Sequence, residues 1–324
     1  MRGKYRIIIE NRKMKYDFEI KRNLTIIKGD SATGKTTLVD MVAEFYENGQ
    51  DSGINLQCDK LCAVLQGKDW KLRLGNIHDS IVFIDEGNAF VSTEEFASEI
   101  KKTNNYYVIV TREALPMLPY SVTEIYGIRN SGKYGDLKQT YNEMYQIYGN
   151  VNPNTIVCPE TVITEDSGAG FAFFEHICGG NGINCVSAAG KSNIFAKAQK
   201  HQHGESVLII ADGAAFGPEM EKIVSLFYIQ KNLYLYLPES FEWLILKSGV
   251  VKDKNIEEIL SETCDFVESS RYISWEQYFN ALLVEKTKDT YLAYAKNILN
   301  KAYLEEKIKC EILEQMERIS LINN

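Results

Sequence analysis

The sequence has no long apolar run, and this absence limits where the protein can act. No segment approaches the roughly 18 uninterrupted apolar residues that a membrane-spanning helix needs. The basic start, Met1–Arg6, is not followed by the apolar stretch of a secretory signal peptide. We therefore expect a cytoplasmic protein that does not enter the membrane.

Regular cysteine spacing and an excess of positive charge are also missing. The odd number of cysteines, seven, in a chain of 324 residues predicts free thiols rather than a disulfide framework. Cys58 and Cys62 have the spacing of one helix face, but no second pair of ligands accompanies them at zinc-finger spacing. The formal net charge of −8 gives no general electrostatic attraction to nucleic acid. These features are typical of a globular intracellular protein.

Short apolar runs alternate with helical patterns along the first half of the chain. Tyr5–Glu10 and Lys15–Ile20 are expected to form a hairpin. Four apolar runs then suit strands buried on both faces of a parallel sheet: Leu24–Ile27, Leu61–Leu65, Ile81–Ile84 and Tyr106–Val110. One helix after Lys35 is expected to bury an apolar face. The alternation predicts an α/β fold.

Turn-forming residues at Tyr148–Asn154 interrupt this pattern and predict a domain boundary. Residues 1–150 then form one domain and residues 151–270 a second α/β domain. The second domain has four strand candidates: Thr161–Thr164, Ile183–Val186, Val207–Ala211 and Asn232–Leu237. Residues 271–324 are expected to be a helical C-terminal segment, with an apolar stripe that includes Leu292, Ala295, Leu299, Ala302, Ile308 and Ile312.

Residues 29–36, Gly29-Asp-Ser-Ala-Thr-Gly-Lys-Thr, match the phosphate-binding pattern G-x-x-x-x-G-K-S/T in full. The loop follows an expected strand and opens an amphipathic helix, so that backbone N–H groups and the helix dipole can face a phosphate. We assign nucleotide binding to Gly29, Asp30, Ser31, Ala32, Thr33, Gly34, Lys35, Thr36 and Thr37. Lys35 is expected to meet the β- and γ-phosphates, and the Thr36 hydroxyl to be a Mg²⁺ ligand.

A second motif supports hydrolysis rather than binding alone. The run Ser80–Ile84 ends in Asp85 and Glu86, and we expect Asp85 to hold Mg²⁺ and Glu86 to act as general base. The next run ends in Thr111, our candidate for sensing the γ-phosphate, and Arg112, a weaker candidate for stabilising charge. Tyr5 and Tyr16 are alternatives for stacking on adenine, although core packing is the better prediction for each.

These residues make the first domain similar to a compact P-loop ATPase of the ABC-related branch. The resemblance covers residues 1–150 and implies Mg²⁺-dependent ATP hydrolysis. ATP is favoured over GTP because no Asn-Lys-x-Asp guanine-reading motif is present. No Leu-Ser-Gly-Gly-like signature precedes Ile81. The head-to-tail dimer of that family is therefore not implied, and a protein partner, a second copy or the rest of the chain is expected to complete the site.

Two strand candidates of the second domain also end in acids, Glu165 and Asp212. The carboxyl ends of parallel strands share one edge of a sheet, where ligands bind. Carboxylates at that edge are suited to hold Mg²⁺ or Mn²⁺ and to support phosphodiester chemistry. We assign Glu165 and Asp212 as metal ligands.

Residues 155–250 resemble a TOPRIM domain, especially those of OLD-family nucleases and related ATPase-linked phage-defence proteins. The resemblance implies a catalytic role for Glu165 and a recurring acid at Glu242, and the segment Ala189–Ile194 fits the family's middle motif. Ala214 occupies the place of the second acid in an Asp-x-Asp motif. Asp166 or Glu219 then compensates, or the domain is a non-catalytic scaffold.

Three functions remain open from the sequence. The first is an ATPase whose nucleotide state controls a TOPRIM-like effector that acts on DNA or RNA, as in phage defence or a mobile element. The second is an ATP-driven switch with a non-catalytic, partner-binding second domain. The third is a small-molecule kinase, which Glu86 beside Asp85 disfavours because that pair suits water as the phosphate acceptor.

Overall fold

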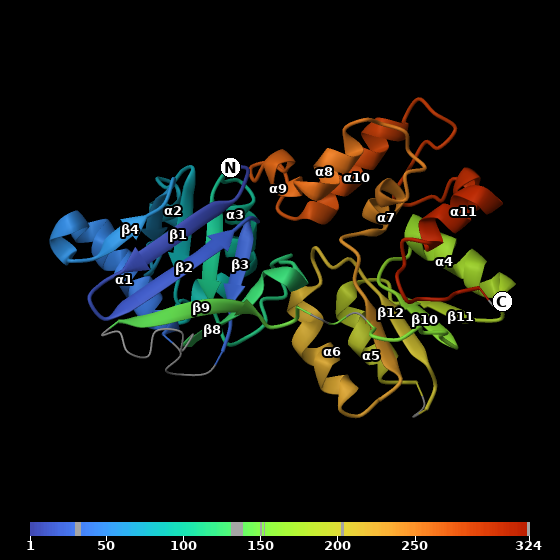
Figure 1. Cartoon of the computed structure of the whole chain (residues 1–324), viewed down its shortest axis with the longest axis horizontal. Coiled ribbons are helices and arrows are strands. Elements are labelled where there is room, and N and C mark those ends of the chain that lie inside the picture. Colours follow the sequence, from blue (N-terminus) through green and yellow to red (C-terminus); the bar gives the residue numbers. More distant parts are fainter. Residues whose placement is uncertain (30–33, 131–138, 150, 152, 202–203, 323–324) are drawn as a thin grey trace. The chain divides into compact units, whose positions relative to one another are not determined.

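The computed structural model describes residues 1–29, 34–130, 139–149, 151, 153–201 and 204–322. The chain forms two compact units (Figure 1). The first contains Met1–Gly149 and Glu262–Ser274, and the second contains Asn150–Ser261 and Trp275–Asn324. Within the described part of the chain, no helix combines the length and apolar character that crossing a bilayer requires.

The segment Glu262–Ser274 joins the first unit through several hydrogen bonds. The Met1 ammonium donates to Glu268 Oε1 at 2.6 Å and to Ser269 Oγ at 2.7 Å. The buried Asn23 side chain donates to the Ser269 carbonyl at 3.1 Å. Because these charged and amide groups are fixed by partners far away in sequence, the segment belongs to the first unit rather than to the C-terminal helices.

The first unit is built on a nine-stranded mixed sheet in the order β4-β1-β2-β9-β8-β3-β7-β6-β5. Its strands are β1 (Tyr5–Glu10), β2 (Met14–Ile20), β3 (Leu24–Ile27), β4 (Asn55–Gln57), β5 (Leu61–Val64), β6 (Ser80–Ile84), β7 (Tyr106–Val110), β8 (Ile125–Asn130) and β9 (Thr140–Gln146). The expected hairpin is confirmed as β1–β2. The four expected apolar runs form neighbouring parallel strands, with β8 pairing parallel to β3 beyond them.

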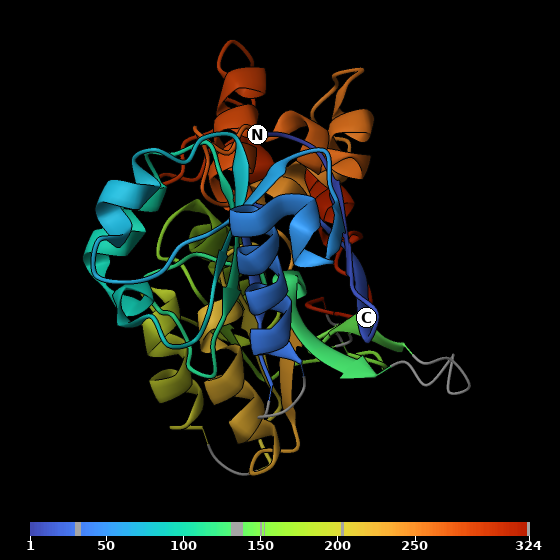
Figure 2. The same ribbon diagram turned by 90° about the vertical axis from the view of Figure 1, so that its left-hand side faces the viewer.

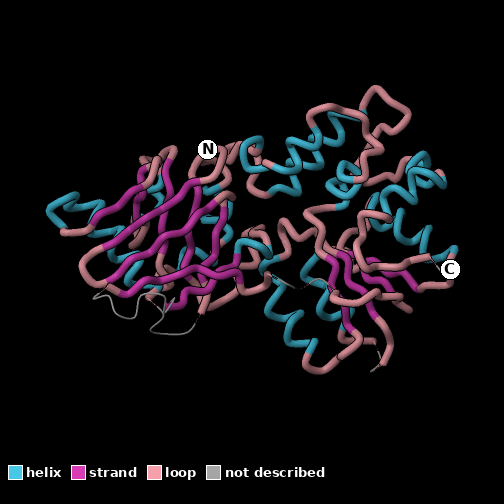
Figure 3. The backbone as a smooth tube through the Cα atoms, in the orientation of Figure 1, coloured by secondary structure: helices cyan, strands magenta, loops and turns pink. Residues whose placement is uncertain are grey.

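The other half of the sheet is antiparallel in part, as the expected hairpin implies, and it also contains two strands, β8 and β9, that the sequence analysis did not predict. The pairs β1–β2, β1–β4 and β8–β9 are antiparallel. Asn11 explains the first of these, because its side-chain oxygen accepts the backbone N–H groups of Lys13 and Met14 at 2.8 Å and tightens the connecting turn. Figure 3 displays these strands in magenta.

Helix α1 (Lys35–Asn48) buries its apolar stripe against this sheet, as expected from the sequence (Figure 2). Leu38 and Val42 are fully buried, and each such side chain contributes about 1.5–3 kcal/mol to stability. The other helices of the unit are α2 (Trp70–Leu74), α3 (Glu94–Ile100), α9 (Thr263–Phe266), η1 (Gly49–Ser52), η2 (Ala89–Ser92) and η3 (Val122–Glu124). This packing fixes the start of α1 at the carboxyl end of β3.

The second unit contains a four-stranded parallel sheet in the order β11-β10-β12-β13. The expected strands are confirmed as β10 (Thr161–Thr164), β11 (Asn184–Ser187), β12 (Val207–Ile210) and β13 (Leu233–Tyr236). Every residue of β10 and β12 is buried, as continuous apolar runs predict. The helices of this unit are α4 (Ala169–Gly180), α5 (Ile194–Ala198), α6 (Met220–Phe227), α7 (Phe241–Lys247), α8 (Ile256–Ser261), α10 (Trp275–Thr287), α11 (Glu306–Leu313), η4 (Lys191–Asn193), η5 (Gly217–Glu219) and η6 (Lys301–Leu304).

The expected helical stripe through Leu292, Ala295 and Leu299 is wrong. Residues 288–300 are turns and an isolated bridge between α10 and η6. The buried Thr287 hydroxyl accepts the Tyr294 backbone N–H at 3.0 Å, which folds the chain back after α10. The later part of the stripe is confirmed, because Ile308 and Ile312 on α11 are buried. The resulting loop places Lys296 at the pocket beside the carboxyl edge of the four-stranded sheet.

Candidate functional site

The first candidate site lies where β3 leads into α1. Gly29 and Gly34 have φ of 136° and 89°, in the region that favours glycine. The Gly34 carbonyl accepts the Tyr16 hydroxyl at 2.8 Å, and a Cβ on Gly34 would lie 2.8 Å from that hydroxyl oxygen. Both glycines of the pattern are therefore needed by the backbone. Asp30–Thr33 lie outside the described residues.

Lys35 is 95% buried, and its ammonium donates to the Gly29 carbonyl at 2.7 Å. A buried cation thus lies at the start of the loop. Thr36 is exposed and Thr37 half-buried in the first turn of α1. Tyr16 is buried in the core, where burial raises its pKa to about 12. Core packing is confirmed for Tyr16, and its ring does not stack at the surface.

The tips of β3, β7 and β6 share one edge of the sheet, because these neighbouring strands are parallel. Thr111 follows β7, which lies between β3 and β6 in the sheet. Its backbone N–H donates to the Ile27 carbonyl at 3.1 Å. Its hydroxyl accepts the Glu113 backbone N–H at 3.1 Å. The topology therefore places Thr111 on the edge that also carries Lys35, Asp85 and Glu86.

The acids at this edge have different surroundings. Asp85 Oδ1 is buried and has no hydrogen-bond partner among the described residues. Burial and the Asp85 charge raise the pKa of Asp40 on α1. Glu86 is held by a two-pronged ion pair with Arg112, at 3.0 Å from Nε to Oε2 and 2.8 Å from Nη2 to Oε1. The edge therefore combines a buried acid oxygen without a partner and an exposed acid in an ion pair.

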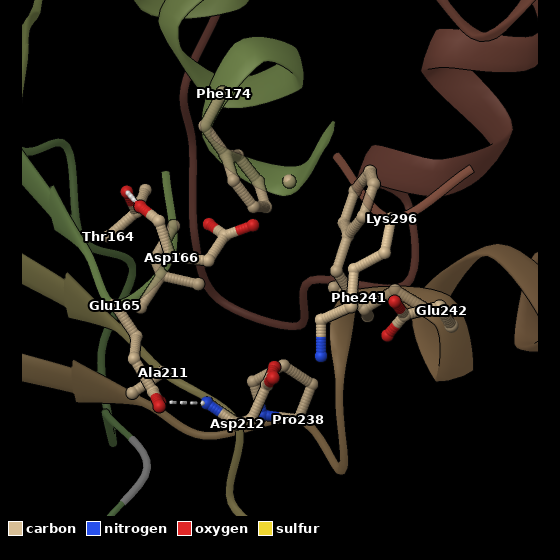
Figure 4. Close-up of a pocket in the computed structure, with 13 residues that line it drawn as sticks. Thr164, Glu165, Asp166, Phe174, Ala211, Asp212, Pro238, Phe241, Glu242 and Lys296 are labelled. Atoms are coloured by element: carbon tan, nitrogen blue, oxygen red, sulfur yellow. Dashed lines mark hydrogen bonds between the residues drawn. The ribbon is translucent and has the colours of Figure 1, made fainter. Parts of the chain in front are cut away.

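A second candidate site lies at the carboxyl edge of the four-stranded sheet (Figure 4). Glu165 and Asp166 follow β10, Asp212 follows β12, and Glu242 lies on α7 after β13. Together with Lys296 they line a pocket in which water-sized groups have about 20 Å³ of space. That space holds a water molecule or a metal ion rather than an organic ligand. The Asp212 backbone N–H donates to Glu165 Oε2 at 3.0 Å, so the expected proximity of these two acids is confirmed.

Lys296 reaches the pocket from the loop that the sequence predicted to be helical. The Lys296 carbonyl accepts the Ala169 backbone N–H at 2.8 Å. A Cβ on Gly168 would lie 2.4 Å from this carbonyl oxygen, so the close approach needs glycine. Figure 4 shows the ammonium directed into the space between the carboxylates of Asp212 and Glu242. No local pattern in the sequence indicates this residue, which is distant from the strand ends along the chain.

The acids of this pocket resist ionisation. Burial raises the pKa of Glu165 to about 7, and repulsion by Glu276 and Asp166 adds to the shift, whereas the Asp212 N–H and Lys191 oppose it. Burial also raises the pKa of Asp166, Asp212 and Glu242. Burial opposes the charge on Lys296, but the ion pair with Glu276 at 2.5 Å, helped by Glu242 and Asp212, outweighs it and raises the pKa of that ammonium. The pocket therefore favours cations.

Ala214 is buried and adds no oxygen to the pocket. Of the two acids that were expected to compensate, Asp166 lines the pocket. Glu219 is buried and pairs with Lys222 at 3.5 Å. The Tyr294 hydroxyl, which sequence reasoning missed, donates to Glu242 Oε1 at 2.9 Å. Of these two acids, Asp166 alone contributes to the lining of this pocket.

A closely spaced set of metal ligands occurs elsewhere. Among the described residues, the one group with three candidate ligand atoms within 4.8 Å of one another is Glu262, Cys264 and Asp265 in the first unit. The acids of the second-unit pocket are farther apart than this. An ion in that pocket would have to draw them together or be shared with water.

Comparison with known proteins adds no name to these sites. No protein-family model matches the chain, and no curated protein matches it either.

Proposed function

We propose that the first unit binds and hydrolyses ATP, and that the second unit is a TOPRIM-like effector that takes a divalent cation and acts on nucleic acid. The buried Asp85 Oδ1, which has no hydrogen-bond partner among the residues that the structure describes, carries the proposal. An acid oxygen kept buried and unpaired is costly unless a cation or donor meets it during function. It lies on the same sheet edge as the buried Lys35 ammonium, which suits a polyphosphate.

The residues at this edge fit Mg²⁺ together with ATP. Asp85 and the Thr36 hydroxyl offer the oxygen ligands that Mg²⁺ prefers. When bound, the ion neutralises charge on the β- and γ-phosphates. Lys35 is expected to leave the Gly29 carbonyl and contact the phosphates. Glu86 is expected to accept a proton from the attacking water, which requires at least one of its oxygens to leave Arg112.

The second unit is assigned to nucleic acid because its acids and Lys296 face a space of ion size at the carboxyl edge of a parallel sheet. Ala214 favours the second candidate, a non-catalytic scaffold that binds a partner, because one acid of the resembling motif is missing. Asp166 favours cleavage, because it supplies a carboxylate to the same pocket.

The ATPase half is tested by measuring ATP binding and phosphate release on the full chain. Lys35→Ala should reduce turnover at least about 100-fold, since it removes a charge that meets the transferred phosphate. Lys101→Ala, an exposed lysine on the same unit, is the matched control and should leave turnover unchanged. Equal turnover in wild type and Lys35→Ala would remove the first unit from the proposal. Phosphate appearing on a small molecule rather than in solution would favour a kinase.

The effector half is tested by cleavage of plasmid DNA and of DNA and RNA oligonucleotides with Mg²⁺ or Mn²⁺, with and without ATP. Cleavage should be lost in Glu165→Gln and Asp212→Asn and be retained in Glu160→Gln, whose side chain is exposed outside the pocket. Absence of cleavage under every nucleotide condition would select the scaffold.

A further inference from the structure

Cys58 and Cys62 lie on either side of the short turn that joins β4 to β5 in the first unit. The expectation that they share a helix face is wrong, because Cys58 follows β4 and Cys62 lies within β5. The chain bends at Asp59 and Lys60 between them, and both cysteines line the same pocket. All of these residues are described by the structure.

The two thiols interact directly. The Cys62 thiol donates to the Lys60 carbonyl at 3.8 Å, within the turn that separates the two cysteines. The neighbouring Cys62 side chain, helped by the backbone N–H groups of Lys60 and Asp59, lowers the pKa of Cys58 to about 7 against the effect of burial. Cys62 is 4% exposed and Cys58 is half-buried. Solvent therefore reaches Cys58 first, and its thiol is the one that ionises near neutral pH.

Both cysteines line a pocket in which water-sized groups have about 460 Å³ of space. The rest of the pocket wall is Phe45, Tyr46, Leu56, Asp59, Lys60 and Leu61. A nucleophilic sulfur atom thus faces a space large enough for a small reagent, with a second sulfur atom beside it. This arrangement is independent of the ATPase and effector sites.

We propose that Cys58 and Cys62 form an oxidisable dithiol site that takes small hydroperoxides. The Cys58 thiolate attacks one peroxide oxygen, the O–O bond breaks, and hydroxide or an alkoxide leaves, which gives a sulfenic acid on Cys58. The Cys62 sulfur then attacks the Cys58 sulfur, and a disulfide forms with loss of water. The two thiols are oxidised by two electrons, and the peroxide is reduced by the same two.

The other cysteines provide internal comparisons. Cys178 and Cys185 also interact with each other, but Cys178 is fully buried. Cys158 is exposed without a neighbouring thiol in these contacts. In the second pair the half-buried thiol, Cys185, has a raised pKa and the thiol with the lowered pKa, Cys178, is buried, whereas in Cys58 solvent access and a lowered pKa occur in the same residue.

The site is tested by treating the native full chain with hydrogen peroxide at pH 7, blocking residual thiols and digesting with trypsin without reduction. Lys60 is the single tryptic site between the two cysteines, so Cys58 and Cys62 fall on separate peptides, Thr36–Lys60 and Leu61–Lys68. Oxidation should join these peptides, and reduction should separate them again. Loss of the Cys58 thiol should be roughly three-fold faster than loss of the Cys158 thiol, from a larger thiolate fraction offset by lower nucleophilicity.

Two variants locate the steps. In Cys62→Ser, Cys58 should stop at the sulfenic acid and be trapped by dimedone, whereas the wild type should give little adduct. In Cys58→Ser, Cys62 should become resistant to peroxide, as Cys178 is expected to be. The proposal is overturned if the two peptides stay separate while Cys158 is oxidised, or if Cys62 reacts at the wild-type rate in Cys58→Ser. The wild-type peptide map tests disulfide formation without any substitution, so its result does not depend on whether the variants fold.

Discussion

In both units carboxylates follow the carboxyl ends of parallel strands, yet the two sheet edges differ in solvation and in the source of their cations. At the first edge, Glu86 is exposed, and its partner Arg112 follows β7, the strand adjacent to β6. At the second edge, Glu165 and Asp212 lie in a small pocket, and Lys296 arrives from a loop far away in sequence.

The difference shows that the carboxyl edge of parallel strands can suit ligands of opposite charge. The first edge buries Lys35 and leaves Glu86, the candidate general base, exposed to water. This arrangement suits an anion that binds together with a metal ion. The second edge removes acids from water and raises their pKa, which suits a cation.

Glu86→Gln is expected to reduce ATP turnover about 100- to 10,000-fold while ATP binding persists, because the amide cannot accept the proton of water. Phosphate release and fluorescent-nucleotide binding measure the two properties separately. Glu47→Gln, an exposed position on α1, is the control. Unchanged turnover in Glu86→Gln would remove the general base from the first edge.

Without divalent cations, the second unit should lose stability as pH rises from about 4.5 to about 7. The folded Glu165 has a pKa of about 7 against an ordinary 4.5, so in this window the folded state holds a proton that the unfolded state has released. The free energy of unfolding then falls by up to about 1.4 kcal/mol per pH unit. Denaturant unfolding at several pH values measures the slope.

Glu165→Gln should flatten this slope, and Mn²⁺ or Mg²⁺ should do the same in the wild type by favouring the ionised acids. A slope that is identical in wild type and Glu165→Gln would mean that the pocket is better solvated than its geometry indicates.

Lys296→Ala is expected to destabilise the protein by about 1–2 kcal/mol, because Lys296, whose side chain is 43% exposed, pairs with Glu276 at 2.5 Å and also offsets the charge of the buried Glu242. Lys288→Ala, at an exposed position in the same loop, should change stability by less than about 0.5 kcal/mol. Thermal unfolding compares the two. Added divalent cation should recover part of the loss in Lys296→Ala, and equal effects of the two variants would contradict the cation role of Lys296.

The sequence predicted what depends on local pattern. Ile81–Ile84 is a continuous apolar run, so its burial as a central strand could be expected. Strand β9 was missed because Thr140–Gln146 is largely polar and only Asn142 within it is buried. Antiparallel pairing with β8 stabilises such a strand through its backbone, and a polar sequence does not reveal that partner.

The residues of the two candidate sites also divide into those that a local sequence pattern reveals and those that depend on long-range contacts. Lys35, Asp85 and Glu86 stand in motifs or at strand ends and were found from spacing alone. Lys296 was missed because an apolar spacing imitated a helix, whereas Thr287 redirects the chain by a hydrogen bond to Tyr294. Long-range contacts of this kind depend on the fold of the whole unit.

Arg112→Ala gives the smallest expected change in stability. Arg112 is 57% exposed, and an ion pair in water is worth about 0.2–1 kcal/mol. Arg129→Ala breaks a comparable exposed ion pair, between Arg129 on β8 and Glu143 on β9, which lies away from the phosphate-binding loop. It should lower the free energy of unfolding by the same amount. Turnover should distinguish them: Arg112→Ala frees both oxygens of Glu86 and is expected to raise basal ATP hydrolysis a few-fold, whereas Arg129→Ala should not.

Raising the salt concentration from about 0.1 to about 0.5 M should move wild-type turnover toward that of Arg112→Ala, because salt screens exposed charges more than buried ones. The same change in salt should alter the stability of the second unit less, because the pocket acids Glu242 and Asp212 are buried. If Arg112→Ala instead lowers turnover, Arg112 stabilises charge on the phosphate rather than restraining Glu86. The ion pair would then open when nucleotide binds, and the first edge would resemble the second in using a cation during function.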